Sequence, residues 1–450
     1  MNLHSKLCAL EASGKRIRVG LIGAGKFGSM FVSQCLRTPG LQLVAIADLS
    51  IERGVSAVTA TGWPIEMVST AGIEDAVTKR RIAVVEDSND LIRSPFVDIV
   101  VEATGVPRAG VLHALECCKF EKHILMVNVE ADAFAGPALA DAAKRAGVIY
   151  SLAYGDQPAL ICEMVDWARA AGLNVVAAGK GTKHEIHYHD ATPETVWTYY
   201  GLTHEQARLG RLSAKMFNSF LDGTKSAVEM AAVANATGLE APVDGLRFPA
   251  CGVDDLATLL GPGAVGGPIS RAGRVEVVSS VFENGKAVPR DLRWGVFTVF
   301  EAPSSYVARC FREYGLITDT SGRFAAMYKP FHLIGLELGI SIANMALRNE
   351  STGSPTGFRA DVVAIAKRDL SAGEILDGEG GYCVWGRLTT AKHSVEMEYL
   401  PIALASDVRL MRSLPRGSVL RWSDVAMPAN DPVVEFRRKM ELALGRPPAK

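Results

Sequence analysis

The sequence predicts an α/β protein in which a doubly wound parallel sheet is followed by an α+β domain and then by a small β-rich domain. Strand and helix patterns alternate along residues 17–152, and the strands are almost continuously apolar. A parallel sheet covered by helices on both faces produces this pattern. From residue 157 the pattern becomes mixed, and after residue 357 short strands and turns follow. We therefore expect domains at residues 1–155, 156–348 and 358–450.

The first domain begins with a strand from residue 17 that leads directly into a glycine-rich turn. Further strands are predicted at residues 41–47, 82–85, 97–101, 123–127 and 148–152. Helices are predicted at residues 29–36, 51–61, 73–80, 88–93, 106–120 and 136–146.

The turn after the first strand reads Gly23-x-Gly25-x-x-Gly28, with Lys26 and Phe27 between the last two glycines. This spacing provides a tight turn, a bare amide edge for a pyrophosphate at a helix N-terminus, and close packing of strand and helix. Asp48 follows the next strand, 20 residues beyond Gly28, where an acid can accept hydrogen bonds from the adenosine ribose. These features predict a dinucleotide-binding Rossmann domain.

The strand at residues 97–101 runs into Glu102-Ala-Thr104-Gly105. Ligands of open α/β sheets bind beyond the carboxyl ends of the strands, so this turn is a second candidate contact with the dinucleotide. The alternative is an ordinary strand–helix turn.

Composition excludes several classes of partner. The chain has 450 residues and is 48% apolar, and 48 Lys and Arg nearly balance 49 Asp and Glu, so nothing favours nucleic acid or an anionic membrane. No apolar run approaches the roughly 18 residues of a membrane span, and the N-terminal residues lack a signal-peptide pattern. The eight cysteines lack CxxC spacing, which fits a reducing compartment. We expect a cytoplasmic protein.

The second domain should contain strands at residues 174–178, 274–283 and 296–302 and helices at 203–221, 225–236 and 331–347. The last of these helices could pack back on the first domain. Residues 260–273 are rich in glycine and proline, which indicates a long loop that could cover an active site.

The stretch GKGTKHEIHYHD, residues 179–190, could carry chemistry. If residues 184–190 are extended, Glu185, His187 and His189 share one face that could bind a divalent metal or a phosphate. Histidines on the solvent-exposed side of a half-buried strand are common, however, and are the more frequent explanation of such a pattern. Lys180 and Lys183 at the sheet edge could polarise a substrate carbonyl or hold an anion. A solvated loop is the alternative.

A second candidate cluster lies at residues 214–238. Lys215, Asn218, Asp222, Lys225 and Glu229 recur at helical spacing, unless Gly223 breaks the helix. A solvated face with ion pairs is the alternative. The apolar sequel MAAVANA indicates a buried helix, so its polar start should face something enclosed, where a lysine beside a carboxylate can transfer protons.

These motifs resemble the homoserine-dehydrogenase group of oxidoreductases, in the order GAGKFG, VDIVVEATG, LMVNVEAD, Asp222 and Lys225. Residues 364–376 and 414–425 resemble a SAF-type domain. The combination looks most like DXR-like oxidoreductases, some of which convert 1-deoxy-D-xylulose 5-phosphate to 2-C-methyl-D-erythritol 4-phosphate with NADPH. Two departures argue against homoserine as substrate: Asn128 is followed by valine instead of lysine, and Asp222 and Lys225 are three apart instead of four.

The resemblance implies an NADPH-dependent reductoisomerase, a homodimer, acting on a small phosphorylated sugar-like substrate in isoprenoid precursor synthesis. Asp222 and Lys225 would manage protons, and a divalent cation, Mg²⁺ or Mn²⁺, would chelate vicinal substrate oxygens. The predicted catalytic residues are Lys225, Asp222, Lys180 and Lys183; the predicted metal ligands are Glu229 and His187. The predicted cofactor-binding residues are Gly23, Gly25, Lys26, Phe27, Gly28, Asp48, Arg53, Thr104, Gly105 and Asn128.

The sequence leaves alternatives open for the cofactor and for the activity. Asp48 alone favours NAD, whereas Arg53 lies close enough in sequence to bind the 2′-phosphate of NADP, towards which the family leans. A dehydrogenase of another sugar-derived or amino-acid-like alcohol is the alternative enzyme. A nucleotide-sensing or carbohydrate-binding protein without turnover is the alternative outside enzymes.

Overall fold

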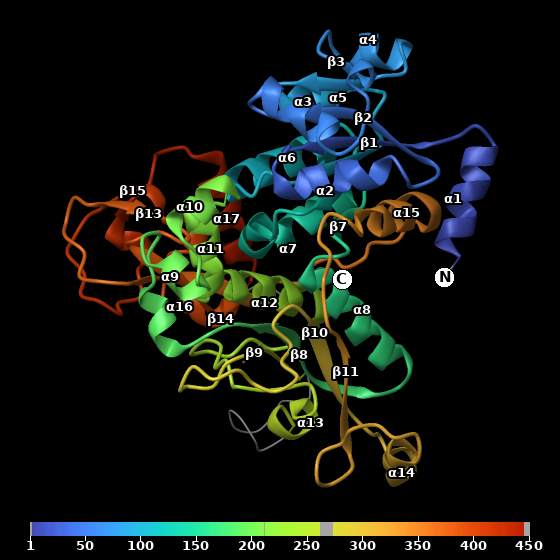
Figure 1. Ribbon diagram of the computed structural model, residues 1–450. Coiled ribbons are helices and arrows are strands. Elements are labelled where there is room, and N and C mark those ends of the chain that lie inside the picture. Colours follow the sequence, from blue (N-terminus) through green and yellow to red (C-terminus); the bar gives the residue numbers. More distant parts are fainter. Residues whose placement is uncertain (1, 211, 262–272, 445–450) are drawn as a thin grey trace. The chain divides into compact units, whose positions relative to one another are not determined.

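The computed structural model describes residues 2–210, 212–261 and 273–444. Contacts divide the chain into two compact units, each made of two segments (Figure 1). Unit 1 consists of Met1–Leu160 and His332–Pro355, and unit 2 of Ile161–Phe331 and Thr356–Lys450. The C-terminal strands thus belong to the same unit as the middle of the chain. The three-domain division stays a prediction.

Unit 1 is built on a seven-stranded sheet in the order β3-β4-β2-β1-β5-β6-β7, in which every neighbouring pair is parallel. This confirms the doubly wound α/β class. The strands are β1 (Ile17–Ile22), β2 (Leu41–Ala47), β3 (Val68–Ser69), β4 (Ile82–Val85), β5 (Ile99–Glu102), β6 (His123–Met126) and β7 (Tyr150–Leu152).

Helices cover this sheet because its strands are apolar on both faces. They are α1 (Leu3–Ala12), α2 (Lys26–Cys35), α3 (Ile51–Thr59), α4 (Ile73–Thr78), α5 (Ser88–Arg93), α6 (Pro107–Lys119), α7 (Val129–Arg145) and α15 (Leu338–Arg348). α15 belongs to the second segment of the unit, and its Leu338 and Ile342 join the same buried cluster as Val19 of β1. It starts seven residues later than predicted. α7 starts at Val129, seven residues before the predicted start, because the Asn128 side chain caps it by accepting from the Ala131 N–H.

Unit 2 contains a four-stranded mixed sheet, β11-β10-β8-β9, in which β8 and β9 are parallel and the other pairs antiparallel. Its strands are β8 (Asn174–Thr182), β9 (Arg274–Ser279), β10 (Val296–Glu301) and β11 (Phe324–Lys329). The helices of this part are α8 (Gln157–Ala170), which starts in unit 1, α9 (Val196–Tyr200), α10 (His204–Leu209), α11 (Ala214–Leu221), α12 (Thr224–Thr237), α13 (Leu256–Leu259) and α14 (Ser305–Glu313).

The C-terminal segment of unit 2, residues 356–444, forms two small antiparallel sheets, β12-β14 and β13-β15-β16. The strands are β12 (Ala360–Ala366), β13 (Ile375–Asp377), β14 (Val384–Thr390), β15 (Ser406–Leu410) and β16 (Val425–Ala426), with helices α16 (Ala391–Glu396) and α17 (Pro432–Ala443).

Helix α12 is the centre of unit 2. It packs against β8 and β9 on one side and against β12 and β14 of the C-terminal segment (Figure 1). Because strands cover it from both sheets, Ser226 to Asn235 are all buried. A helix that is apolar all round is expected in such a place, and the prediction of a buried helix here is confirmed.

Two sequence expectations on conformation need correction, and a third lies mostly outside the described residues. β8 continues to Thr182, and after it Ile186–Asp190 form a 3-10 helix with Tyr188 N–H bonded to the Glu185 carbonyl, so the expected extended face of residues 184–190 is wrong. The helix predicted at 203–221 is two helices, α10 and α11, and Ser213 caps the second. The long loop at 260–273 lies, for residues 262–272, outside the described residues.

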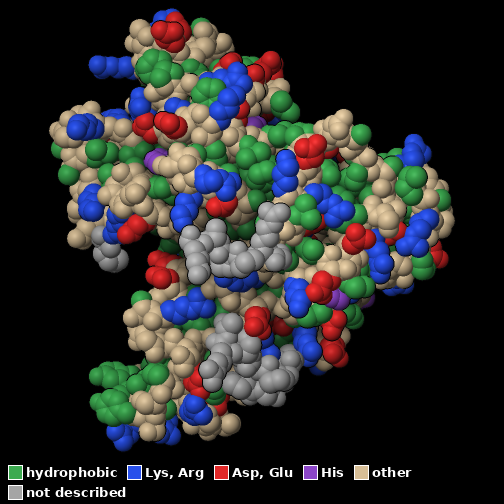
Figure 2. Space-filling model, turned by 180° about the vertical axis from the view of Figure 1, so that it is seen from behind, with side chains coloured by type: hydrophobic (Ala, Val, Ile, Leu, Met, Phe, Trp, Pro, Cys, Tyr) green, Lys and Arg blue, Asp and Glu red, His purple; other side chains and the backbone are tan. Residues whose placement is uncertain are grey.

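Within the described ranges, no helix is both long and apolar enough to cross a membrane. On the face shown in Figure 2, basic and acidic side chains are interspersed. This agrees with the balanced charge of the sequence.

Candidate functional site

The glycine-rich turn of unit 1 has the geometry of a pyrophosphate cradle. Gly23 has φ +97°, and a Cβ there would lie 2.7 Å from the Ala103 carbonyl oxygen. A Cβ on Gly28 would lie 2.2 Å from the Gly23 carbonyl oxygen, so helix and turn pack too closely for a side chain. Gly25, the N-cap residue of α2, has open space at its Cβ position. Each glycine therefore meets the requirement predicted for it.

Asp48 and Arg53 lie together at the end of β2. The Asp48 carboxylate accepts hydrogen bonds from the Ala24 N–H (2.8 Å) and the Ser50 N–H (3.0 Å), which ties the end of β2 to the glycine-rich turn. Arg53 Nε lies 3.0 Å from Asp48 Oδ1, while 58% of the Arg53 side chain stays exposed. The arginine thus neutralises the carboxylate and still reaches solvent.

The turn after β5 is fixed by a small hydrogen-bond network. Thr104 donates its hydroxyl to Glu102 Oε1 (2.6 Å), and the Asn128 side-chain amide donates to the Val106 carbonyl (3.0 Å). Gly105 is exposed with φ +66°. Thr104, Gly105 and Asn128 are therefore at the carboxyl edge of the sheet, beside the glycine-rich turn. Lys26 is exposed, and Phe27 packs against the core of the unit.

This edge fits a nicotinamide dinucleotide. An open glycine N-cap on a ten-residue helix, an acid at the end of β2 and a fixed turn after β5 are the contacts that such a cofactor uses.

Sequence reasoning missed a polar relay behind the turn. His113 Nδ1 lies 3.1 Å from Glu102 Oε1, and His113 Nε2 lies 2.9 Å from Ser88 Oγ. Glu102 is 1% exposed, and its Oε1 is held by Thr104 and His113 together. A histidine within an otherwise ordinary helix gave no signal of this.

In unit 2, two of the predicted catalytic lysines are engaged. Lys180 of β8 forms a buried ion pair with Glu229 of α12, so the charges of the two side chains compensate each other. Lys183 donates to the Tyr199 carbonyl (2.7 Å). Burial lowers the pKa of Lys183, and the nearby charge of Arg293 adds to this effect.

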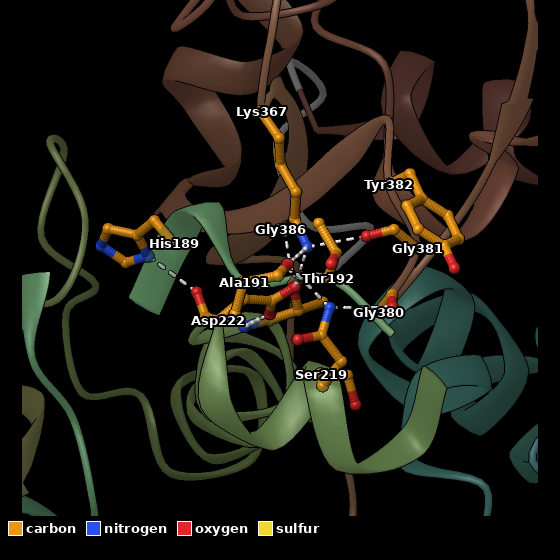
Figure 3. Close-up of polar contacts among 12 residues, drawn as sticks. His189, Ala191, Thr192, Ser219, Asp222, Lys367, Gly380, Gly381, Tyr382 and Gly386 are labelled. Carbon is orange, nitrogen blue, oxygen red and sulfur yellow. Dashed lines mark hydrogen bonds and ion pairs between the residues drawn. The ribbon is translucent and has the colours of Figure 1, made fainter. Parts of the chain in front are cut away.

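Asp222 is paired with a residue far along the chain (Figure 3). Its carboxylate is fully buried; Oδ1 accepts the Thr224 N–H (2.9 Å), and Oδ2 lies 2.7 Å from Lys367 Nζ. The expected single face of Lys215, Asn218, Asp222, Lys225 and Glu229 is interrupted, because Gly223 has φ +91° and separates α11 from α12. Lys225 is half-buried in the first turn of α12.

His189 lies against the same junction between α11 and α12. Its Nδ1 donates to the Asp222 carbonyl (2.7 Å), and its ring stacks on Trp385 with centroids 3.9 Å apart and planes 17° apart. The Cβ position of Gly223 is 3.3 Å from His189 Cε1. Burial lowers the pKa of His189, which favours the neutral ring with its Nε2 lone pair available.

The donor set does not fit the predicted cation. Among the residues that the structure describes, no group of three or more His, Cys, Asp or Glu side chains could hold a metal ion. Glu229 is bound to Lys180, and His187 is exposed beside Glu185.

Two family matches cover adjoining segments. Residues 23–153 match the NAD-binding domain of homoserine dehydrogenase, and residues 155–338 match the catalytic domain described as oxidoreductase DRL. No curated protein matches the chain.

Many solved structures are also similar. A Magnetospirillum magnetotacticum MS-1 oxidoreductase structure is 20% identical (TM-score 0.27), with 38% of this chain and 49% of that chain covered. A dehydrogenase-type protein from Thermotoga maritima is 13% identical (TM-score 0.37), and the similarity covers 74% of this chain and 90% of that chain. The myo-inositol dehydrogenase of Lactobacillus casei, solved with NAD(H) and myo-inositol, is 14% identical (TM-score 0.29), with 41% and 50% covered. The chain thus spans about half the length of the first and third of these proteins.

The glycine-rich edge and the two family matches define an NAD(P)-dependent oxidoreductase. It carries an NAD-binding domain of the homoserine dehydrogenase type and a DRL catalytic domain. A protein without turnover, the alternative left open by the sequence, is therefore not supported.

Proposed function

We propose that this oxidoreductase is a dehydrogenase of a small anionic alcohol, sugar-derived or amino-acid-like. The observation that carries this choice is the buried pair of Lys180 and Glu229. The reductoisomerase hypothesis assigned Glu229 to a divalent cation, and a carboxylate that is already neutralised by a buried lysine is a poor ligand for Mg²⁺.

Unit 1 would hold the cofactor through its own backbone and side chains. The amides of the turn at Gly25 would receive the pyrophosphate, Asp48 would accept from the adenosine ribose, and Arg53, paired with Asp48, would hold a 2′-phosphate. Thr104 and Asn128 keep the turn after β5 in place. When bound, the nicotinamide ring accepts or gives a hydride. We propose NADP(H) as the preferred form, because Arg53 already neutralises Asp48.

Unit 2 would bind the substrate. We propose that Lys225 exchanges the hydroxyl proton, since it is half-buried at the start of an otherwise buried helix. Lys183, with Arg293 near it, supplies positive charge for an anionic substituent. Asp222 and Lys180 act through the residues they pair with, because both are buried in ion pairs.

The second candidate is the reductoisomerase that makes 2-C-methyl-D-erythritol 4-phosphate. The match of residues 155–338 to the DRL catalytic domain supports it, together with the resemblance of the C-terminal segment to a SAF-type domain. This reaction rearranges the carbon skeleton, whereas a dehydrogenase leaves it unchanged.

A substrate panel distinguishes the two candidates. The protein is incubated with NADPH or NADH and 1-deoxy-D-xylulose 5-phosphate, with Mg²⁺, Mn²⁺ or EDTA, and with NADP⁺ or NAD⁺ and a set of phosphorylated polyols, sugar acids and homoserine. The nicotinamide absorbance gives the rate, and carbon NMR of the product shows the skeleton. We expect EDTA-resistant oxidation of an alcohol with its skeleton retained. Cation-dependent formation of 2-C-methyl-D-erythritol 4-phosphate would instead establish the reductoisomerase.

Three further proposals concern the setting of the enzyme. We propose a homodimer, a cytoplasmic location and a SAF-type C-terminal domain. Light scattering, cell fractionation and the structure of a complex with substrate test them in turn.

A further inference from the structure

The C-terminal segment of unit 2 contacts the middle segment of the same unit where α11 ends and α12 begins. Three of its groups that reach this junction are the Lys367 ammonium just after β12 and the Gly386 N–H of β14 (Figure 3), and the Trp385 ring of β14. They reach Asp222, Thr224 and His189 respectively. All of these contacts lie within unit 2.

The Lys367 ammonium is buried, and all three of its hydrogen-bond donors are used. Its Nζ donates to Asp222 Oδ2 (2.7 Å), the Ala191 carbonyl (2.8 Å) and the Gly381 carbonyl (2.9 Å). The side chains of Lys367 and Asp222 are 2% and 0% exposed. A buried ion pair often adds little net stability compared with apolar residues of the same size, whereas it fixes the geometry of the groups it joins. This pair therefore points to positioning.

The approach of β14 to α12 is unusually close. The Gly386 N–H donates to Thr224 Oγ1 (2.8 Å), and a Cβ on Gly386 would lie 2.8 Å from Thr224 Cγ2. Only glycine allows this strand to come so near the first turn of α12. That turn carries Lys225, the side chain proposed above to exchange the substrate proton.

The same segment orients an imidazole. Trp385 stacks on His189, and the Asp222 carbonyl accepts the His189 Nδ1–H. A carbonyl can only accept, so the bond fixes the tautomer in which Nε2 carries the lone pair. His189 is still partly exposed, beside Gly223 at the start of α12.

We propose that the C-terminal segment is part of the catalytic unit: Lys367, Gly386 and Trp385 are positioning residues that fix the first turn of α12, and His189 accepts through Nε2 a hydrogen bond from a second substrate hydroxyl, next to the one whose proton Lys225 exchanges. This inference rests on the proposed function for its substrate. It assigns a role to residues that the sequence resemblance placed in a separate appendage.

The test compares Lys367→Met and Trp385→Leu in the full-length protein with two matched controls. Lys392→Met removes an exposed lysine of α16, and Trp167→Leu removes a partly exposed tryptophan of α8. With an alcohol that the wild type oxidises, we expect both positioning variants to lose about 10- to 100-fold in kcat/KM, the range for a misplaced catalytic group. The cofactor affinity, measured by fluorescence, should remain within twofold. Trp385→Phe, which keeps an aromatic stack, should recover much of the loss.

A second readout needs no substrate. Nitrogen NMR of histidine-labelled protein, with the His189 signal assigned from His189→Asn, reports which ring nitrogen carries the proton. We expect the Nδ1–H form in the wild type and a mixture of tautomers in Trp385→Leu and Lys367→Met. If no alcohol is oxidised, the proposed function fails, and the tautomer ratio still decides on positioning. Unchanged tautomers with unchanged kcat/KM in a folded Trp385→Leu variant would overturn the inference even if Lys367→Met does not fold.

Discussion

At the scale of single residues, we propose that the pair of Asp48 and Arg53 determines how the protein recognises the adenosine ribose of the cofactor. Asp48 uses both carboxylate oxygens within the protein, for Ala24, Ser50 and Arg53. A bare carboxylate at this position repels a 2′-phosphate, and Arg53 removes that repulsion. Sequence spacing could suggest this pairing, but only the structure shows that the arginine bonds the aspartate.

Arg53→Ala should therefore change cofactor preference. We expect NADPH binding to weaken by about 1.5 to 3 kcal/mol, the range for a hydrogen bond to a charged group, and NADH binding to weaken far less. Fluorescence titration of both cofactors measures this. Arg108→Ala, on α6, is a matched control. Equal losses for the two cofactors would show that Arg53 only stabilises Asp48.

Lys225→Met tests the proposed proton exchange. Methionine keeps most of the side-chain volume and removes the charge, so turnover should fall by about two to four orders of magnitude while NADPH affinity stays unchanged. Lys286→Met, at an exposed position, serves as the control. Near-normal turnover would move the proton exchange to another side chain, with Lys183 the next to test.

At the scale of elements, the glycine-rich turn could be predicted from the sequence because its conformational requirements are local. Three glycines, a strand and a helix follow one another within the sequence, and each glycine meets a backbone neighbour or an open edge. The buried α12 was also readable, since an apolar run without polar faces needs cover on all sides.

Gly25→Val tests this element directly. Gly25 has φ −71° and no atom within 4 Å of its Cβ position, so valine should cause no strain and no clash. Its methyl groups would occupy the space of the pyrophosphate, and dinucleotide binding should be abolished. Binding is followed by NADPH fluorescence and folding by thermal melting. A folded variant that binds NADPH like the wild type would refute the assignment of this turn.

The ion-pair partners of the polar residues could not be predicted from the sequence. The sequence placed Asp222 beside Lys225, but the partner of Asp222 is Lys367, 145 residues later. Helical or strand periodicity cannot detect an ion pair between segments that only tertiary folding brings together. The alternation expected for residues 184–190 failed for a related reason: β8 ends at Thr182, and the chain then turns into a 3-10 helix.

At the scale of the whole molecule, unit 1 contains a buried aspartate, Asp132, whose surroundings disfavour the ionised form of its carboxyl group. Asp132 of α7 is 0% exposed; Oδ1 accepts the Tyr150 hydroxyl (2.8 Å), and Oδ2 has no hydrogen-bond partner among the described residues. Burial raises the pKa of Asp132 to about 7. The folded unit therefore keeps a proton that the unfolded chain releases near pH 4, where an ordinary aspartate titrates.

This difference makes stability depend on pH. Below about pH 4 both states are protonated and the full stability is present; as the pH rises to about 7, the unfolded state loses its proton first and stability falls.

Asp132→Asn removes this loss, because an amide does not ionise and still accepts from Tyr150. From pH 5 to pH 8 we expect the variant to lose less stability than the wild type, by about 2.6 kcal/mol, because a unit of pKa shift corresponds to about 1.4 kcal/mol and about two units of the shift lie within this window. Scanning calorimetry measures it, using the transition that NADPH raises, because a ligand stabilises the unit that binds it. Other titrating groups, such as His123, are common to both proteins and cancel in the comparison. Parallel pH profiles for Asp132→Asn and wild type would mean that Asp132 ionises in the folded unit at its ordinary pKa.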